Sequence, residues 1–479
     1  MRLRKNKMEI SSIDLSQIFQ VMTTLLTAYF LFANFIFLLL LVGAFFSIRK
    51  FIRARPMVES LWKRFSRLGP PVSIVAPAFN EESSIVESLY SFLTLKYPRL
   101  EVILVNDGST DSTFKKVFDA FKLEPTHLFY NDQLSKTEIL GTYSSPLYPN
   151  LFVIDKKRGG KADSINVGIG FSRYDFFCSV DSDSILDRDA LLKVVLPLIE
   201  KPETTVASGG TVRPVNGSIV QAGRVFETRL SKNPLVLIQI VEYLRAFLFG
   251  RVGWNLYNGT MIISGAFGVF KKEAVMEVGG YREGSLGEDM ELIMRLRQNA
   301  VDHDREVSIA FISDPVCWTE VPSTFKTLAK QRDRWQRGLA EVLFRYKNIL
   351  FNPRFGTVGL LAYPYFFFVE LFGPWLELFS YIFIGLGYWM GWIQLELVFL
   401  FLLVDWFFGI LMSFGAVLIE ESAYYKYPKV RDLLVLLIFS FFEQIGFRQL
   451  NSFWRLRGTI RYLRGVKHWG RMERMGFQE

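Results

Sequence analysis

The sequence predicts an α/β domain with a mostly parallel sheet, flanked by helices that span a membrane. Between residues 70 and 322, short β-rich runs alternate with amphipathic stretches, which is the pattern of strands connected by helices. Outside this region, uncharged runs exceed the roughly 20 residues that a helix needs to cross a bilayer. Half of the 479 residues are hydrophobic and 16% are aromatic, which excludes a disordered, collagen-like or small disulfide-linked protein.

The first apolar segment, residues 15–48, contains no charged side chain and is predicted to be one tilted transmembrane helix. It is too long for the core of a signal peptide and lacks a small-residue cleavage site, so we expect it to be retained. The juxtamembrane segment that follows, 49–69, is more basic than the N-terminal tail, 1–14. Because basic residues favour the cytosolic side, the α/β domain is expected in the cytosol and the N-terminus outside.

The α/β domain is predicted to occupy residues 70–322, and about 250 residues suit one domain. Five strands are expected, at residues 72–79, 101–106, 151–154, 176–181 and 205–212. Five helices are expected to begin near Glu82, Asp111, Lys161, Asp187 and Glu288. Residues 124–150 lack periodicity and contain proline and glycine, which predicts a loop or an insertion.

Membrane character returns after the α/β domain. Residues 323–354 are expected to form amphipathic interface helices, and residues 355–453 a transmembrane region. The apolar pieces of this region lie at 355–395, 397–419 and 433–442. The basic tail, 454–479, is expected in the cytosol, which requires an even number of crossings after the α/β domain. The sequence therefore leaves the number of crossings open.

Polar side chains follow the first two predicted strands, at the edge where open α/β sheets bind ligands. Asn80 and Glu81 follow the first strand, and Asp107 and Asp111 follow the second. Such residues commonly cap the next helix, and for Asp111 this interpretation is as good as a ligand contact. Asp107, at the strand end, is better placed to accept hydrogen bonds from a bound base or ribose.

Asp181 and Asp183 follow the predicted strand 176–181. Two acids that are two residues apart in extended backbone point the same way, so they can converge on one Mg²⁺ or Mn²⁺ that binds a diphosphate. The alternative interpretation is a solvated acidic turn, because the DxD pattern is short. Upstream, Lys161 follows two glycines at a predicted helix start, which suits an anionic ligand.

Two further motifs lie near the end of the domain. Glu288 and Asp289 begin a predicted helix, where acids are usually caps or partners of the helix dipole, an interpretation that suits Glu288 better than Asp289. The run QRDRW, residues 331–335, lies on an amphipathic helix expected at 324–346. The alternative is that this helix lies on the membrane surface with its tryptophan as an anchor.

In this order, the motifs resemble those of the processive membrane glycosyltransferases of family 2, which include cellulose, chitin, hyaluronan and poly-N-acetylglucosamine synthases. The QRDRW run fits the Q(Q/R)xRW signature of that group, residues 181–183 fit its DxD, and residues 287–289 fit its (T/G)ED element. The resemblance covers nearly the whole chain. It implies a GT-A type nucleotide-sugar-binding domain and an α-helical transmembrane bundle that forms a channel.

The resemblance also implies roles for the candidate residues. Asp107 and Asp181 would contact the uridine and diphosphate of the donor, and Asp183 with Asp181 would bind Mg²⁺ or Mn²⁺. Asp289, beside Glu288, would be the catalytic base that deprotonates the acceptor hydroxyl, with inversion at the anomeric carbon. The other expected substrate-binding residues are Asn80, Glu81, Lys161, Ser264, Gly265, Gln331, Arg332, Arg334 and Trp335.

The expected function is processive extension of a β-linked exopolysaccharide from UDP-GlcNAc or UDP-Glc, with export through the protein's own channel in the plasma (inner) membrane. Arg334 would add positive charge near the pyrophosphate, and Trp335 would stack on the terminal sugar. The alternatives are transfer of a single sugar to a lipid phosphate and a receptor or scaffold with a degenerate transferase domain. Expected partners are the UDP-sugar, the growing polysaccharide, membrane lipids and accessory export or modification proteins, with no nucleic acid.

Ionisable side chains interrupt the apolar C-terminal pieces. Because charge in hydrocarbon is costly, we expect them to face the interior of the bundle or water. They are Glu370, Glu377, Glu396, Asp405 and Glu443. No disulfide is expected between Cys178 and Cys317, which are far apart in sequence and lie in apolar surroundings.

Two features differ from the cellulose synthases of the group. Those enzymes carry a regulatory cyclic-dinucleotide domain after the last helix, and none is expected here. Arg457 and Arg461 have the spacing of the RxxxR motif of that domain, but two arginines in a basic tail are weak evidence for it. The single N-terminal helix also differs from synthases with two.

Overall fold

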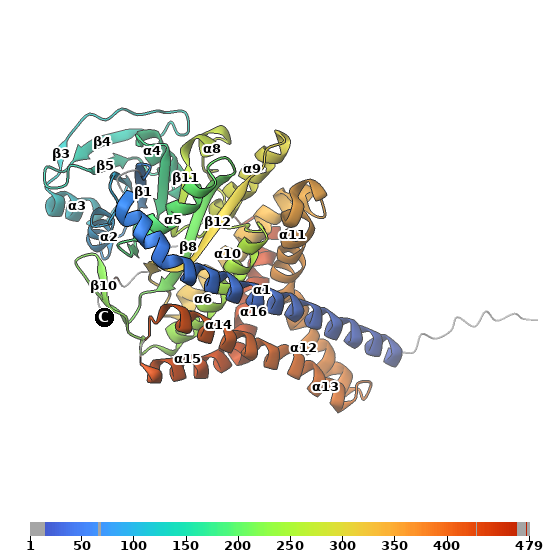
Figure 1. Cartoon of the computed structure of the whole chain (residues 1–479). Coiled ribbons are helices and arrows are strands. Elements are labelled where there is room, and N and C mark those ends of the chain that lie inside the picture. Colours follow the sequence, from blue (N-terminus) through green and yellow to red (C-terminus); the bar gives the residue numbers. More distant parts are fainter. Residues whose placement is uncertain (1–14, 66–68, 428, 467–475, 477–479) are drawn as a thin grey trace, which may run out of the picture.

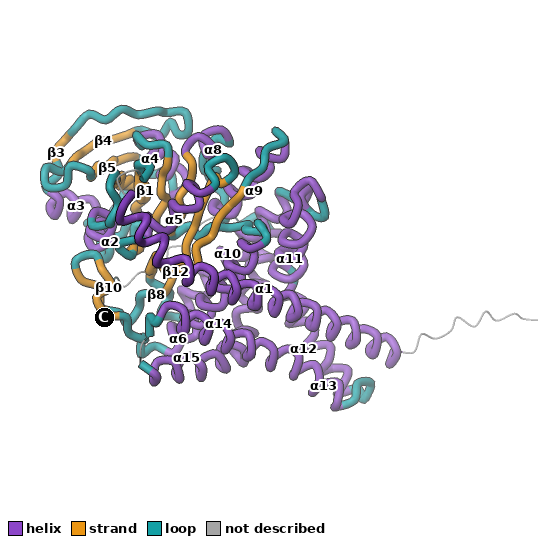
Figure 2. Tube along the Cα trace, viewed as in Figure 1, coloured by secondary structure: helices purple, strands orange, loops and turns teal. Residues whose placement is uncertain are grey.

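The computed structural model describes residues 15–65, 69–427, 429–466 and 476. The predicted N-terminal tail, 1–14, lies outside the described residues, as do residues 467–475 and 477–479 of the predicted basic tail. All strands lie in one part of the molecule, and a group of long helices extends from it (Figure 2). Helix α1 (Leu15–Phe65) runs along both parts and continues well beyond the predicted residues 15–48 (Figure 1).

One ten-stranded sheet forms the core of the α/β domain, in the order β3-β4-β5-β2-β1-β6-β11-β8-β12-β7. Its strands are β1 (Val72–Ala78), β2 (Leu100–Asp107), β3 (Glu124–Pro125), β4 (Ile139–Ser144), β5 (Leu151–Lys156), β6 (Phe176–Val180), β7 (Ser184–Leu186), β8 (Thr205–Pro214), β11 (Phe267–Lys271) and β12 (Ser308–Thr319). Strands β9 (Ile219–Gln221) and β10 (Arg224–Glu227) form a separate hairpin.

The sheet is mixed, so the prediction of a mostly parallel sheet is wrong. Strands β5, β2, β1 and β6 are parallel neighbours, as are β8 and β12. Strand β11 lies between β6 and β8 and is antiparallel to both. Strand β4 is antiparallel to β5 and to the edge strand β3, and the other edge strand, β7, is antiparallel to β12. The parallel arrangement of β1, β2, β5 and β6 brings their carboxyl ends to one edge of the sheet, where the candidate residues lie.

The five predicted strands correspond to β1, β2, β5, β6 and β8. They were recognisable because their side chains are buried almost continuously, as in β2, where seven of the eight residues are buried. Strand β4 lies within residues 124–150, which were expected to be a loop. Its side chains are all partly or fully exposed, so its sequence lacks the apolar pattern of a strand.

Helices pack on the sheet, and one begins at or near each of the five predicted helix starts. Helix α4 packs on β1 and β2, whereas α5 and α6 pack on β8. The helices of the α/β domain are α2 (Ile85–Leu93), α3 (Thr113–Phe121), α4 (Lys161–Phe171), α5 (Ala190–Glu200), α6 (Pro234–Phe247), α7 (Trp254–Leu256), α8 (Lys272–Glu277) and α9 (Glu288–Asp302). The amphipathic helix expected at 324–346 is α10 (Phe325–Arg345). Both cysteines are buried free thiols.

After β12, the regular elements formed by the described residues are all helices. They include α11 (Tyr363–Tyr365), α12 (Gly373–Trp389), α13 (Leu395–Leu402), α14 (Phe408–Tyr424), α15 (Val430–Phe442) and α16 (Arg448–Leu463). Residues 454–463, which were expected in the basic tail, belong to α16. This helix packs against α10, which explains why a segment rich in arginine is not a free tail.

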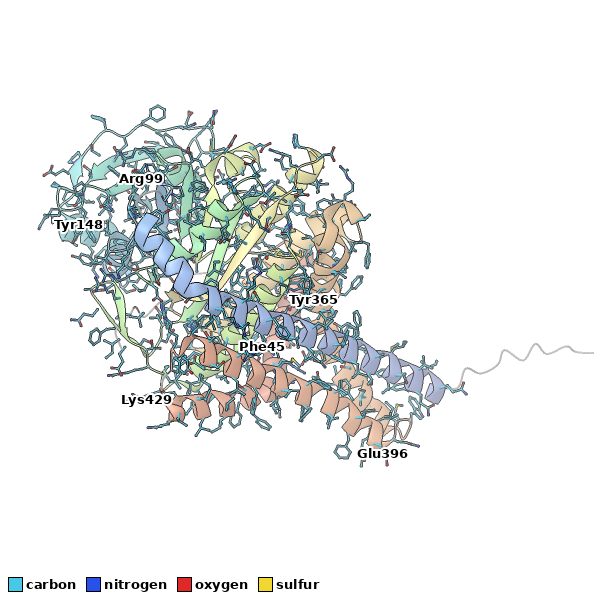
Figure 3. The ribbon with its side chains drawn as sticks, viewed as in Figure 1. Phe45, Arg99, Tyr148, Tyr365, Glu396 and Lys429 are labelled. Carbon is cyan, nitrogen blue, oxygen red and sulfur yellow. The ribbon has the colours of Figure 1, made fainter. Side chains whose placement is uncertain are left out.

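Among the described residues, two helical stretches are long and apolar enough to cross a membrane, Gln17–Arg53 and Leu395–Tyr424. Val358–Leu371 and Gly373–Trp389 form a pair bent by 44°, which gives a third span if the pair acts as one. Helix α15, which contains the predicted piece 433–442, has 13 residues and is shorter than the roughly 20 residues of a span. Glu396 is exposed at the end of the long helices that is far from the α/β domain (Figure 3).

Candidate active site

Three predicted motifs meet around Lys161, the first residue of α4. Its Nζ lies 2.7 Å from Asp181 Oδ1, directly after β6, and 3.5 Å from Glu288 Oε1 at the start of α9. The same atom is 3.5 Å from the carbonyl oxygen of Gly265, whose amide donates a 3.2 Å hydrogen bond to Asp289 Oδ2. One site is therefore built from α4, β6, α9 and the loop before β11.

The charges at this site influence one another. Burial disfavours the charge of Lys161, but the carboxylates of Asp181 and Glu288 outweigh this effect and raise its pKa. Burial also raises the pKa of Glu288, an effect that Lys161 opposes and Asp289 reinforces. Lys161 is therefore held as a cation among three carboxylates.

The two acids of the DxD motif differ in exposure. Asp183 is buried, whereas the Asp181 side chain is 27% exposed. In the part of the chain that the structure describes, no group of three or more His, Cys, Asp or Glu side chains is arranged to hold a metal ion. Two carboxylates nevertheless suit Mg²⁺ or Mn²⁺, because such ions complete their coordination with water and substrate phosphates. Residues 182 and 183 form a turn, in which the Ser184 amide donates to the Asp181 carbonyl at 3.0 Å, so the expected extended backbone of the pair is wrong. Binding of a cation by this pair stays a prediction.

Asp107 is buried and holds the loop that leads to α4. Its Oδ1 lies 2.5 Å from Lys156 Nζ and accepts a hydrogen bond from the Gly159 amide at 2.8 Å, while its Oδ2 accepts one from the Gly160 amide at 2.9 Å. Lys156 Nζ also lies 2.6 Å from Asp163 Oδ2. The position of Lys161 thus depends on a buried ammonium group between two carboxylates.

Asn80 connects the ends of β1 and β2. Its backbone is left-handed, with φ of 57°, and its Oδ1 accepts a 2.8 Å hydrogen bond from the Thr110 amide. Glu81 is buried, and its amide donates to Thr113 Oγ1 at 2.8 Å. Asp111 Oδ1 accepts from the Thr113 amide at 2.9 Å, which agrees with its interpretation as a local turn residue. These side chains shape the edge of the site.

The loop before β11 lies directly beside the DxD motif. Ser264 Oγ accepts a 3.3 Å hydrogen bond from the Ala266 amide, and the Asp181 amide donates to the Ala266 carbonyl at 3.2 Å. This pairing explains how Ser264 and Gly265, which are far from Asp181 in sequence, come to lie next to it.

Helix α10 carries the QRDRW run along the same side of the domain. Arg332 lies 2.6 Å from Glu242 Oε2, and its guanidinium is 4.5 Å from the centre of the Trp335 ring, which is 42% exposed. Gln331 is buried. Burial raises the pKa of Glu288, and the charge of Arg334 acts against this rise, so Arg334 belongs to the electrostatic surroundings of the carboxylates.

Residues 73–279, which contain Asp107, Lys161, Asp181 and Gly265, match the family model described as glycosyl transferase family 2. This part of the chain is therefore similar to that family. The chain is 27% identical over 296 residues to the poly-beta-1,6-N-acetyl-D-glucosamine synthase of Staphylococcus epidermidis, which covers 62% of this chain and 61% of that protein. It is 29% identical over 276 residues to the synthase of the same name from Staphylococcus aureus (strain COL), over 57% and 56% of the two chains. The chain thus spans about three fifths of these relatives.

Among solved structures, the chain is similar to the mannosyltransferase PcManGT from Pyrobaculum calidifontis in complex with GDP-Man and Mn²⁺. The TM-score is 0.51 at 18% sequence identity, covering 90% of this chain and 99% of the other. This similarity shows the fold. The α/β domain therefore has a GT-A fold with a mixed sheet.

Two residues that support the candidate site or its surroundings were not predicted. Lys156 is fully buried at the end of β5, and a lysine that ends a strand with an apolar beginning is a signal of a buried ion pair. Asp333, the variable position of the QRDRW run, lies 2.9 Å from Arg461 Nη1 on α16. No local sequence signal connects residues that are so far apart in the chain.

Proposed function

We propose that the chain is a processive, inverting, metal-dependent glycosyltransferase that extends a β-linked polysaccharide from UDP-GlcNAc. The observation that carries this proposal is the meeting of Asp181, Glu288 and Asp289 around Lys161 at the carboxyl edge of a GT-A sheet. The staphylococcal relatives support the choice of N-acetylglucosamine, because they are named as synthases of a polymer of that sugar. UDP-Glc is the other donor that the sequence motifs allow.

The donor is proposed to bind with its diphosphate beside Lys161, Asp181 and Asp183. The two acids would hold Mg²⁺ or Mn²⁺, and when bound, the cation supplies positive charge that stabilises the departing UDP. The complex of the similar mannosyltransferase with Mn²⁺ supports a cation in this role. Asp107 Oδ2 accepts one hydrogen bond within the chain, so it retains the capacity to accept another from the uridine.

Asp289 is proposed to be the base. Its Oδ2 and Oδ1 accept hydrogen bonds from the amides of Gly265 and Met290, at 3.2 and 2.8 Å, which fix the direction of the carboxylate. It would remove the proton of the acceptor hydroxyl as that oxygen attacks the anomeric carbon of the donor. A carboxylate suffices, because the hydroxyl becomes acidic as the new bond forms.

The acceptor is proposed to approach along α10. The exposed ring of Trp335, held by Arg332, offers a flat apolar surface on which the terminal sugar would stack. Arg334 would add positive charge near the diphosphate. Gln331, Asn80 and Glu81 would complete the substrate-binding surface.

Export through the C-terminal helices, in a multi-pass plasma membrane protein with a cytosolic catalytic domain, is part of the same proposal. Buried ionisable side chains support a polar interior: Arg448 Nε lies 2.8 Å from Glu377 Oε1, and Arg245 Nη2 lies 2.5 Å from Glu443 Oε1. The growing polysaccharide, membrane lipids and accessory export or modification proteins would be the partners.

The test is a panel of UDP-sugars with the purified full chain and either Mg²⁺ or Mn²⁺, scored for UDP release and product length. With UDP-GlcNAc as the donor, we expect release of UDP and formation of a long polymer. A product that carries one sugar on a lipid would contradict processive synthesis, and background UDP release with every donor would contradict an enzyme.

A further inference from the structure

The variable residue of the QRDRW run, Asp333, contacts the C-terminal helix. It is buried, and its Oδ2 lies 2.9 Å from Arg337 Nε on α10 and 2.9 Å from Arg461 Nη1 on α16. Arg457 Nε, also on α16, lies 3.7 Å from Asp333 Oδ1. A buried carboxylate is stable only when it is paired, so Arg461 and Arg457 of α16 add to the stabilisation that Arg337 gives Asp333.

Helices α10 and α16 pack against each other, and their backbones come close together at Gly458. A Cβ at Gly458 would lie 2.8 Å from the Asp333 carbonyl oxygen and 3.0 Å from Gln336 Cβ. Gln336 donates to Thr459 Oγ1 at 3.1 Å and accepts from Arg455 Nε at 2.8 Å. The contact therefore combines close packing with buried hydrogen bonds.

Another part of α10 touches the turn that begins α9. A Cβ at Gly287 would lie 3.1 Å from the Gly338 carbonyl oxygen, and one at Gly338 would lie 2.9 Å from the Leu286 carbonyl oxygen. Glu341 Oε2 accepts a 3.0 Å hydrogen bond from the Leu286 amide. Gly287 immediately precedes Glu288 and Asp289, the first two residues of α9. The position of α10 therefore influences where these two carboxylates lie.

We propose that α16 is a positioning element of the active site: it fixes α10 through Asp333 and Gly458, and α10 fixes the Gly287 turn that carries Asp289. This inference rests on the proposed function for the role of Asp289. Lys161, Asp181 and Asp183 are carried by α4 and by the end of β6, and Lys161 meets this chain of contacts at Glu288, 3.5 Å away. Displacing α16 should therefore misplace the base and Trp335 more than it misplaces the donor-binding side chains of α4 and β6.

The test compares Gly458→Ala with Gly385→Ala in the purified full chain. Gly385 lies in α12, and a Cβ there would have no atom within 4 Å, so it is the matched helical control. Alanine favours a helix more than glycine does, so helix propensity cannot explain a loss at Gly458. Gly458→Ala is expected to lower kcat at least about 10-fold with less than about threefold change in the donor KM, because small misplacements of reacting groups are costly.

Hydrogen exchange provides a second measurement, which does not depend on catalytic turnover. Hydrogen exchange over residues 284–292 should increase in Gly458→Ala and not in Gly385→Ala, while exchange over 161–171 stays unchanged in both. Arg461→Gln should resemble Gly458→Ala, and Arg461→Lys should restore most of the activity because it keeps the charge beside Asp333. Unchanged exchange over residues 284–292 overturns the inference. A loss of kcat that is fully explained by a lower thermal midpoint of unfolding also overturns it. Absence of UDP release by the wild-type chain would instead contradict the proposed function.

Discussion

The ammonium nitrogen of Lys161 lies 2.7 Å from Asp181 Oδ1, so the first residue of α4 is paired with the first acid of the DxD motif. The same nitrogen lies 3.5 Å from Glu288 Oε1. Without donor, Lys161 neutralises part of a cluster of acids that would otherwise repel one another. A diphosphate arriving with its divalent cation would provide Lys161 with an anionic partner and Asp181 with a cationic one.

The first prediction concerns this lysine. Lys161→Gln should lower kcat/KM for the UDP-sugar about 10- to 100-fold, because a charge-assisted hydrogen bond contributes about 1.5–3 kcal/mol. Lys161→Arg keeps the charge and should retain more activity. Initial rates of UDP release measure both variants, and equal losses would show that the shape of the side chain matters more than its charge.

The second prediction concerns the metal. Asp183→Asn removes one of the two carboxylates that are proposed to hold the cation, so UDP binding should lose its dependence on Mg²⁺ or Mn²⁺. In the wild-type chain, chelation with EDTA should abolish UDP release, and added Mn²⁺ should restore it. Calorimetry of UDP binding with and without Mn²⁺ measures the effect. Asp304→Asn, at a side chain that is 93% exposed, is the control and should behave as wild type.

The third prediction separates chemistry from binding. Asp289→Asn keeps the size of the side chain and the acceptor oxygen for the Gly265 amide but cannot take a proton, so polymer formation should cease while UDP still binds. A radiolabelled polymer assay and UDP titration report the two properties. Normal polymer yield would refute the assignment of Asp289 as the base.

The sequence predicted the site better than it predicted the connections that hold the site together. Asp107, Asp181 and Lys161 were recognisable because each follows an apolar strand or a glycine turn whose position the local pattern defines. The pairing of Asp333 with Arg461 depends on how two distant helices pack, and basic residues made the second helix resemble a tail. Strand β4 was missed because its side chains are partly or fully exposed and show no apolar alternation.

The fourth prediction concerns the acceptor. Trp335→Ala removes the exposed ring beside Arg332, so elongation should fall more than hydrolysis of the donor. Trp335→Phe retains an aromatic face and should recover part of the chain length. Product sizing together with UDP release distinguishes these effects, and equal losses in both would indicate that Trp335 only supports the fold of α10.

The fifth prediction concerns Lys156, which is fully buried with its Nζ 2.5 Å from Asp107 Oδ1 and 2.6 Å from Asp163 Oδ2. Lys156→Met would leave two carboxylates in the interior without their shared cation. Removing one partner of a buried ion pair costs about 3–5 kcal/mol. The thermal midpoint of the full chain should therefore fall by about 10 °C.

The neighbouring residue provides a matched control for this variant. Lys157 Nζ lies 2.5 Å from Glu138 Oε2, but both side chains are more than half exposed, at 63% and 62%. Exposed ion pairs contribute about 0–1 kcal/mol, so Lys157→Met should leave the midpoint nearly unchanged. Because Asp107 also binds the amides of Gly159 and Gly160, donor affinity should fall in Lys156→Met alone. Equal midpoints for the two variants would mean that Lys156 does not hold the loop before α4.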